Sequence, residues 1–141
     1  MDEVLGREIE IEKEFIKKTL KLLNKAMARK RKTEIELTAI GAFLHDIYNG
    51  MENIIKRTLK AKGIRIKDTG SFHKDLLDRA VEEKIVSQTL SERLDEYRGF
   101  RHFFVHGYGL NLRKDELISL AKGILTIWKD FEKEARNYLS N

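Results

Sequence analysis

The sequence predicts an all-α protein, an antiparallel up-and-down bundle of four long helices and one short helix. The 141 residues include no proline, and Lys, Arg, Asp and Glu make up 36% of them, a composition typical of long helices with many surface ion pairs. Apolar residues also recur at intervals of seven along most of the chain. Because about 100 to 200 residues form a typical domain, we expect one domain over residues 1–141.

The first helix is predicted from a single apolar stripe. Ile9, Ile16 and Leu23 fall seven residues apart, and Leu20 and Met27 lie on the same side of a helix. This stripe predicts one face packed against the rest of the bundle.

The second helix has a start signal and two apolar series. Thr33 followed by Glu36 has the spacing of a capping box. Beyond it, two series with a period of seven predict a long and well-buried helix, and they comprise Leu37, Leu44 and Met51, and Ile40, Ile47 and Ile54. We expect this helix to end near Gly63, before the loop GIRIKDTGS.

The second half of the chain predicts one short and two long helices. Ser71 is placed to cap the short helix, whose apolar residues are Phe72, Leu76, Leu77, Ala80 and Val81. Thr89 and Glu92 repeat the capping-box spacing, and Gly107 and Gly109 are expected to end the helix that follows. Asn111 is a possible cap for the last helix, whose apolar series is Leu117, Ile124, Phe131 and Tyr138.

Charge and composition narrow the functional classes. The formal charge of +5 mildly favours acidic partners such as nucleic acid. The absence of cysteine excludes disulfides, thiolate zinc sites and a cysteine nucleophile. The N-terminal stretch MDEVLGREIEIEKEF lacks the apolar core of a signal peptide, and no window approaches the roughly 18 to 20 apolar residues of a membrane span. We therefore expect a soluble, cytoplasmic protein without membrane association.

A basic run lies between the first two helices. Five of the eight residues of KAMARKRK are Lys or Arg, namely Lys25, Arg29, Lys30, Arg31 and Lys32. The simpler interpretation is a solvated helix end whose charge complements the helix dipole. The alternative is a contact with an RNA backbone.

The most unusual stretch is the motif segment, residues 97–109, YRGFRHFFVHGYG. Arg98 and Arg101 lie one turn apart on a helix, and Arg101 shares a face with Tyr108. His106 is five residues from Arg101, about 140° around an α-helix, so the two converge only if the helix breaks or a second chain contributes. An arginine gives bidentate contacts to phosphate and a histidine can transfer protons near neutral pH.

These residues could cleave RNA without a metal. The ribose 2′-hydroxyl would be the nucleophile, His106 the proton-transfer group, and Arg101 the clamp for the charge that develops on the phosphorane. The structural alternative is that His106 is an ordinary helix-end histidine, that Tyr108 is a boundary residue, and that the arginines pair with Glu96 or Asp95.

A metal site and a supporting carboxylate are further candidates. His102 and His106 have the i, i+4 spacing of two metal ligands, but no glutamate lies between them and no cysteine is available, so we predict no metal and no cofactor. Most polar residues of LHDIYNGMENIIKR are expected on the solvated flank of the second helix. Glu52 and Asp46 from this stretch could nevertheless orient an arginine or histidine of the motif segment.

The motif segment resembles the signature of the HepT-like ribonuclease toxins of the HEPN superfamily. In it Arg101 is followed after four residues by His106, and His106 after one residue by Tyr108. The phrases FLHDIYNGMENIIKR, LLDRAV and LDEYRGFRHFFVHGYGLNL occur in the order typical of that family, so the resemblance covers nearly the whole chain. His102 adds a histidine that the minimal motif does not require, and an exchange of roles between His102 and His106 stays open.

The resemblance implies a helical bundle that forms a homodimer, with the motifs of two subunits meeting in a shared cleft. It implies a metal-independent endoribonuclease, the toxin of a toxin–antitoxin system, in which Arg101 and His106 are catalytic. From their place in the motif segment we expect Arg98 and His102 to be supporting residues. The implied antitoxin is a nucleotidyltransferase that adenylylates Tyr108 and so blocks the RNA path. The alternatives are a non-enzymatic module that binds a nucleotide or docks a nucleotidyltransferase, and a purely structural helical dimer.

Overall fold

A computed structural model describes residues 3–108 and 114–140, and all the secondary structure within these ranges is helical. The α-helices are α1 (Glu3–Met27), α2 (Glu34–Ala61), α3 (Phe72–Glu82), α4 (Gln88–Phe103) and α5 (Lys114–Ser140). A π-helical turn, Phe104–Tyr108, continues α4. The prediction of an all-α bundle with four long helices and one short helix is confirmed. No helix in the described part of the chain is long and apolar enough to cross a membrane.

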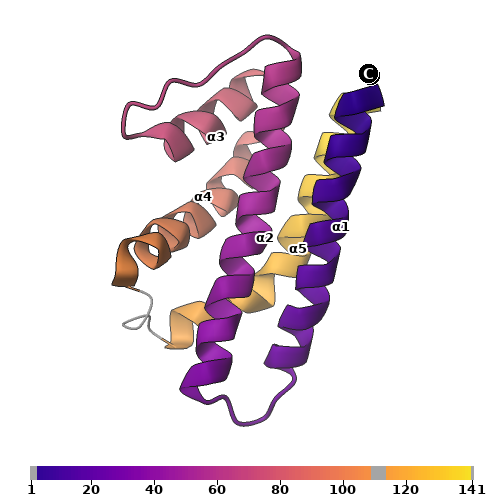
Figure 1. Cartoon of the computed structure of the whole chain (residues 1–141). Helices are drawn as coiled ribbons and strands as arrows, with labels where there is room; N and C mark the ends of the chain where they lie inside the picture. The colour runs from indigo at the N-terminus through magenta and orange to yellow at the C-terminus, as the bar shows by residue number, and fades with distance from the viewer. Residues whose placement is uncertain (1–2, 109–113, 141) are drawn as a thin grey trace.

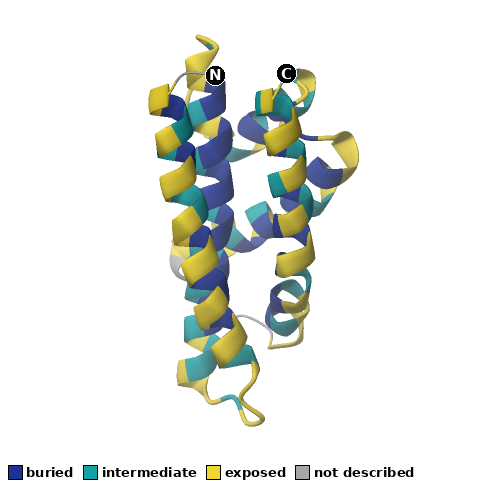
Figure 2. Cartoon of the chain, turned by 90° about the vertical axis from the view of Figure 1, so that its right-hand side faces the viewer, coloured by how far each residue is buried: buried dark blue, intermediate teal, exposed yellow. Residues whose placement is uncertain are grey.

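Helices α1 and α2 form an antiparallel hairpin, and α5 lies beside α1 (Figure 1). The predicted stripe of α1 is confirmed, because Ile9, Ile16 and Leu23 are buried. Both series of α2 also face the core, although Leu37 at its start is only partly buried. Figure 2 shows the buried residues of these helices turned inward and the exposed ones outward.

The backbones of α1 and α2 approach closely at Gly50. A Cβ atom built on Gly50 would lie 2.7 Å from Ile16 Cγ1 and 2.8 Å from Ile16 Cδ1, inside van der Waals contact. The absence of a side chain at Gly50 therefore lets the Ile16 side chain, which is fully buried, lie directly against the α2 backbone.

The helix starts agree with the sequence at α2 and differ at α3 and α4. Thr33 and Glu36 form the expected reciprocal capping box. Ser71 occupies the N-cap position of α3, but its side chain makes no capping hydrogen bond. The predicted cap at Thr89 is wrong, because α4 begins at Gln88 and the Ser87 hydroxyl accepts the hydrogen bond from the Leu90 N–H.

The end of α2 follows the prediction. Its last helical residue is Ala61, and Gly63 has a φ of 78°, a left-handed conformation that glycine adopts without steric cost. The chain then passes to α3, which lies on the opposite side of α2 from α1 (Figure 1).

Helix α5 packs on α4 through its buried face and two polar contacts. Leu117, Ile124 and Phe131 are buried as predicted. The Tyr97 hydroxyl donates to the Leu120 carbonyl at 2.7 Å, and Arg93 pairs with Asp130 at 2.6 Å. The expected cap Asn111 lies outside the described residues.

Candidate functional site

The helix that contains the motif segment does not stop at Gly107. Helix α4 runs to Phe103, and the π-helical turn continues it through Gly107 to Tyr108. The prediction that Gly107 ends the helix is therefore wrong. Gly109 and the side chain of Tyr108 lie outside what the structure describes. A π-helical turn changes the register of the residues beyond it and is frequent at functional sites.

Two histidines come together at this turn. The rings of His102 and His106 have their centroids 4.2 Å apart, and both residues are exposed. No hydrogen bond or ion pair between Arg101 and His106 occurs among the described residues. The π-helical turn therefore brings His106 beside His102 rather than into direct contact with Arg101.

Arg101 differs from the other arginines of the central helices. Arg57, Arg79, Arg93 and Arg98 each pair with a carboxylate. Within residues 3–108 and 114–140 no ion pair is formed by Arg101; its Nε is buried without a hydrogen-bond partner, as are the Nε atoms of Arg57 and Arg79. The guanidinium therefore keeps hydrogen-bonding capacity for an anion from outside the chain.

Glu52 lies in the core rather than on the solvated flank of α2. It is 1% exposed, and its carboxylate oxygens lie 2.8 and 3.0 Å from Nδ1 of His73 on α3. Because a carboxylate only accepts, we assign the Nδ1 proton to His73. The prediction that Glu52 orients a motif residue is not seen as a direct contact; its hydrogen-bond partner is a histidine from another helix.

Tyr48 is also buried, at 1% exposed, which again contradicts the expected solvated flank. Its hydroxyl is buried and forms no hydrogen bond with any residue that the structure describes. Burial, followed by the negative charge of Glu52, raises the pKa of Tyr48 far above its ordinary value, and Arg98 and Arg101 lower it by less. The hydroxyl therefore stays protonated between the carboxylate and the two arginines.

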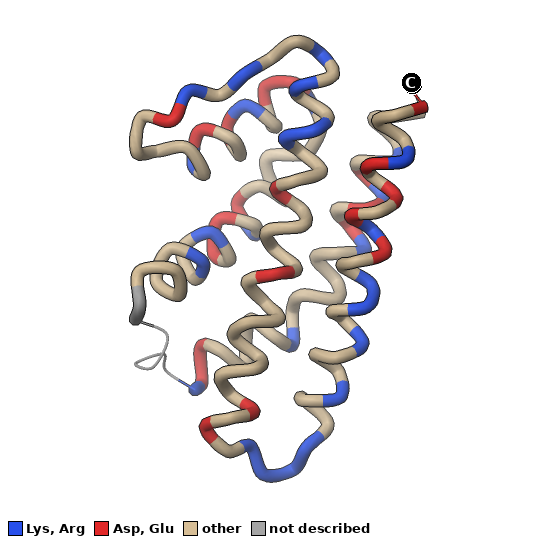
Figure 3. The backbone as a smooth tube through the Cα atoms, viewed as in Figure 1, with Lys and Arg blue, Asp and Glu red and all other residues tan. Residues whose placement is uncertain are grey.

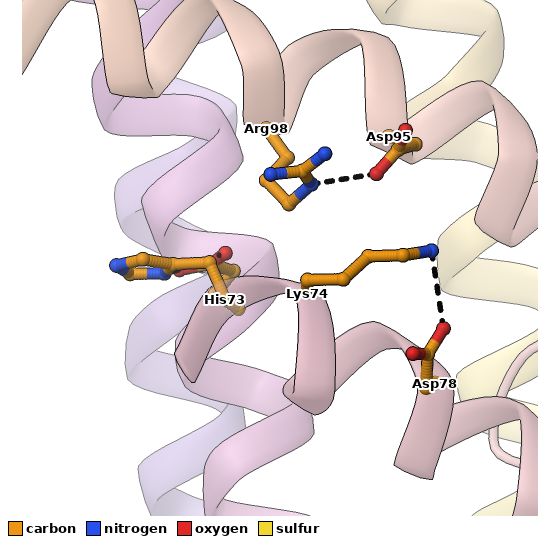
Figure 4. A network of polar contacts seen from close by, with 6 residues as sticks. His73, Lys74, Asp78, Asp95 and Arg98 are labelled. Carbon is orange, nitrogen blue, oxygen red and sulfur yellow. Dashed lines mark hydrogen bonds and ion pairs between the residues drawn. The ribbon is translucent and has the colours of Figure 1, made fainter. Parts of the chain in front are cut away.

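Arg98 pairs with a carboxylate of its own helix, as the structural alternative predicted. Its Nε donates to Asp95 Oδ1 at 2.6 Å, which lowers the pKa of Asp95 and raises that of Arg98 (Figure 4). Arg98 also interacts electrostatically with Tyr48 and Glu52. We call these five residues from α2, α3 and α4 the Glu52 cluster: Tyr48, Glu52, His73, Arg98 and Arg101.

Asp46 and the basic run lie outside this cluster. Asp46 contacts Nδ1 of its neighbour His45 at 3.2 Å, and the His45 ring stacks on Phe104 at 5.4 Å between centroids. Lys25 lies in the last turn of α1, and residues 29–32 form the basic loop between α1 and α2 at one end of the bundle (Figure 3). Arg29 in this loop lies 3.9 Å from Glu36, so part of the loop's charge is balanced locally.

Other site types find little support in the described residues. A pocket of about 990 Å³ lies at the C-terminal end of α2, where Thr58, Lys62, Ser87 and Tyr138 are among the lining residues, and no residue of the motif segment lines it. Within the described ranges, no group of three or more His, Asp and Glu side chains is arranged to hold a metal ion.

His73 and Tyr48 are the members of the cluster that the sequence did not predict as part of an RNA-cleaving site, and His73 is the one bonded to Glu52. It is separated from Glu52 by 21 residues and lies on a different helix, so no local spacing relates the two. The available signal was Glu52 itself, a charged residue that follows Met51 of one apolar series and precedes Ile54 of the other.

Three comparisons place this geometry among known proteins. A family model described as HepT-like protein matches residues 39–141. A solved structure, a cytosolic protein of unknown function, YutE, from Bacillus subtilis, superposes with a TM-score of 0.78 and 24% sequence identity over 95% of this chain and 90% of that chain. At that identity the likeness supports the fold alone. A search of curated proteins gives no match.

Proposed function

Because the chain belongs to the HepT-like protein family, we propose that it is a metal-independent endoribonuclease of the HEPN type, with Arg101 and His106 as its catalytic residues. The observation that supports this most is Arg101, a half-buried arginine without a carboxylate partner among the described residues, which directly precedes His102, whose ring lies beside that of His106. A permanently charged group in that state is suited to an anionic ligand, and the family indicates RNA.

The proposed reaction is an internal transesterification. The ribose 2′-oxygen attacks the adjacent phosphorus and loses its proton to a base, while the bond from phosphorus to the 5′-oxygen breaks and that oxygen gains a proton. The products are a 2′,3′-cyclic phosphate and a 5′-hydroxyl end. His106 would transfer one of these protons, and Arg101 would stabilise the charge on the phosphorane oxygens.

The exchange of roles between the two histidines stays part of the proposal. Their ring centroids are 4.2 Å apart, so the two imidazoles occupy neighbouring positions and either is a candidate for the proton transfer. Separate His102→Ala and His106→Ala variants assign the role, because loss of a proton-transfer group lowers the rate by about 100-fold to 10,000-fold.

The test is RNA cleavage in EDTA by the purified protein and its variants. His106→Ala and Arg101→Lys should each lower the rate by at least about 100-fold, the second because lysine keeps the charge but loses the planar fork. Arg93→Lys is the matched control, since Arg93 pairs with Asp130 away from the motif segment. Cleavage by His106→Ala at the parental rate would exclude the assigned role of His106.

We also propose a homodimer in which two motif segments face each other. Phe103 and Val105 are 37% and 50% exposed beside the two histidines, and a partner subunit would cover this apolar surface. Val105→Lys should shift the protein from dimer to monomer in light scattering. A parent that is monomeric at micromolar concentration would contradict this part of the proposal.

The proposed partner is a nucleotidyltransferase antitoxin that adenylylates Tyr108, and the proposed compartment is the cytoplasm. Intact mass spectrometry after co-expression should detect added adenylyl groups on the parent and none on Tyr108→Phe. A parent that binds nucleotides tightly but cleaves no RNA would instead support the alternative function, a binding module for a nucleotide or a nucleotidyltransferase.

A further inference from the structure

The buried carboxylate of Glu52 has basic groups from two other helices around it. His73 of α3 donates to both of its oxygens, at 2.8 and 3.0 Å, and Arg98 of α4 interacts with it electrostatically. A carboxylate that is 1% exposed needs such partners, because an isolated buried charge is strongly unfavourable. The Glu52 carboxylate thus connects α2 with α3 and α4.

The His73 ring has one nitrogen committed and one available. Nδ1 is held by Glu52, so the ring orientation is fixed and Nε2 points away from the carboxylate. The side chain is 33% exposed, which leaves part of the ring at the surface. This arrangement is the one by which a carboxylate commonly orients a functional imidazole.

Arg98 has the same combination of one fixed and several available donors. Its Nε donates a hydrogen bond to Asp95, and the side chain is 30% exposed. Its two terminal nitrogens form no ion pair with any residue that the structure describes. Figure 4 shows His73 of α3 and Arg98 of α4 near α2, with the guanidinium of Arg98 beside Asp95. Asp95 binds Nε of the guanidinium, so its two terminal nitrogens are left to bind a ligand.

We propose that His73, with its ring doubly protonated so that Nε2–H donates, and Arg98 form a second phosphate subsite, which binds the RNA phosphate next to the scissile one. This rests on the proposed function, in which Arg101 holds the scissile phosphate. Arg98 precedes Arg101 by three residues, a rise of about 4.5 Å along the helix. Consecutive phosphates of one strand are spaced by about 3.4 Å or more along the axis, so two arginines one turn apart can each bind one of them.

The subsite predicts a dependence on the number of phosphates in the substrate. A dinucleoside monophosphate has only the scissile phosphate, whereas a trinucleoside diphosphate has a second phosphate for His73 and Arg98. His73→Gln should lower the ratio of kcat/KM for the trinucleotide to that for the dinucleotide about tenfold, mainly through KM. Arg79→Gln is the matched control, because Arg79 lies at the other end of α3 and pairs with Glu82 at 3.7 Å and with Glu83 at 3.6 Å, and it should leave the ratio unchanged.

The Glu52→Gln variant tests whether the orientation of the His73 ring matters in addition to the presence of that ring. The amide oxygen of glutamine can still accept from Nδ1, so this variant should change the substrate ratio less than His73→Gln. An equal proportional loss of activity on both substrates in His73→Gln would mean that His73 only supports the fold, and would overturn the subsite.

A binding measurement tests the subsite without requiring cleavage. In the His106→Ala background, Arg98→Gln should reduce the slope of log K against log salt for a short oligoribonucleotide by about 0.7, the value for one phosphate contact on a single strand. An unchanged slope would overturn the subsite.

A parent that cleaves nothing refutes the proposed function, and the slope still decides whether Arg98 contacts RNA. If ATP binds as tightly as the oligonucleotide and His73→Gln weakens both equally, the cluster serves a free nucleotide and the RNA assignment is wrong.

Discussion

Replacing Gly50 with alanine perturbs the contact between the α2 backbone and the Ile16 side chain of α1. In an open helical position, alanine stabilises relative to glycine by about 1 kcal/mol. At Gly50 the new methyl group would lie 2.7 and 2.8 Å from two atoms of Ile16, and overpacking of this kind costs about 1 to 3 kcal/mol. We therefore expect Gly50→Ala to lower the free energy of unfolding by up to about 2 kcal/mol.

The same substitution should change sign when Ile16 is truncated. Ile16→Ala alone costs about 2 to 5 kcal/mol, because this fully buried side chain leaves a cavity. It also removes both atoms that the Gly50→Ala methyl group would meet. In the Ile16→Ala background, Gly50→Ala should therefore raise stability by about 1 kcal/mol.

Urea unfolding of the four proteins of this double-mutant cycle measures the coupling. Gly99→Ala is the control, since a Cβ on Gly99 meets no atom within 4 Å, and it should stabilise the protein by about 1 kcal/mol. Effects of Gly50→Ala that agree within about 0.5 kcal/mol in the two backgrounds would refute the steric argument.

Three further predictions concern the caps and the polar cluster. Ser87→Ala should lower the free energy of unfolding by about 1 kcal/mol, whereas Thr89→Ala should have an effect near zero, as measured by urea unfolding. Glu52→Ala should cost about 1 to 3 kcal/mol in the same assay and Glu52→Gln less, since glutamine can still accept from the imidazole; equal costs would contradict the role of that hydrogen bond. Asp95→Asn should remove less than about 1 kcal/mol, because the Asp95–Arg98 pair is partly solvated. The pKa of Asp95 is lowered in the folded state, so its contribution is present above about pH 4 and is lost as the pH falls further; a difference between parent and Asp95→Asn that grows on acidification would contradict this assignment.

The helices could be predicted because their apolar residues follow the helical period. On α1, for example, residues spaced by seven lie on one face of the helix, and Ile9, Ile16 and Leu23 are therefore buried together. Starts and ends depend on interactions beyond the segment itself. Ser87 and Thr89 both suit an N-cap, and Ser87 is also bound by Glu134 of α5, whose carboxylate accepts from the Ser87 N–H at 2.6 Å.

The site was predicted less completely than the fold, for a similar reason. The motif segment identified Arg101, His106 and Arg98 from their chemistry and from a family resemblance. The burial of Glu52 and Tyr48 depends on α3 and α4 covering that face of α2, and the pairing of Glu52 with His73 joins residues that share no local pattern. The catalytic roles themselves stay predictions.

The hydrogen bond from Tyr97 to Leu120 has a consequence for biosynthesis. Ribosomes deliver the chain from its N-terminus, so the motif segment is made before the helix on which Tyr97 rests. Until α5 has emerged and docked, α4 lacks the carbonyl partner of Tyr97 and the apolar face that buries it. A nascent chain that ends before Leu120 therefore contains every residue of the Glu52 cluster but lacks this contact with α4, which can form only after the first turns of α5 have been synthesised.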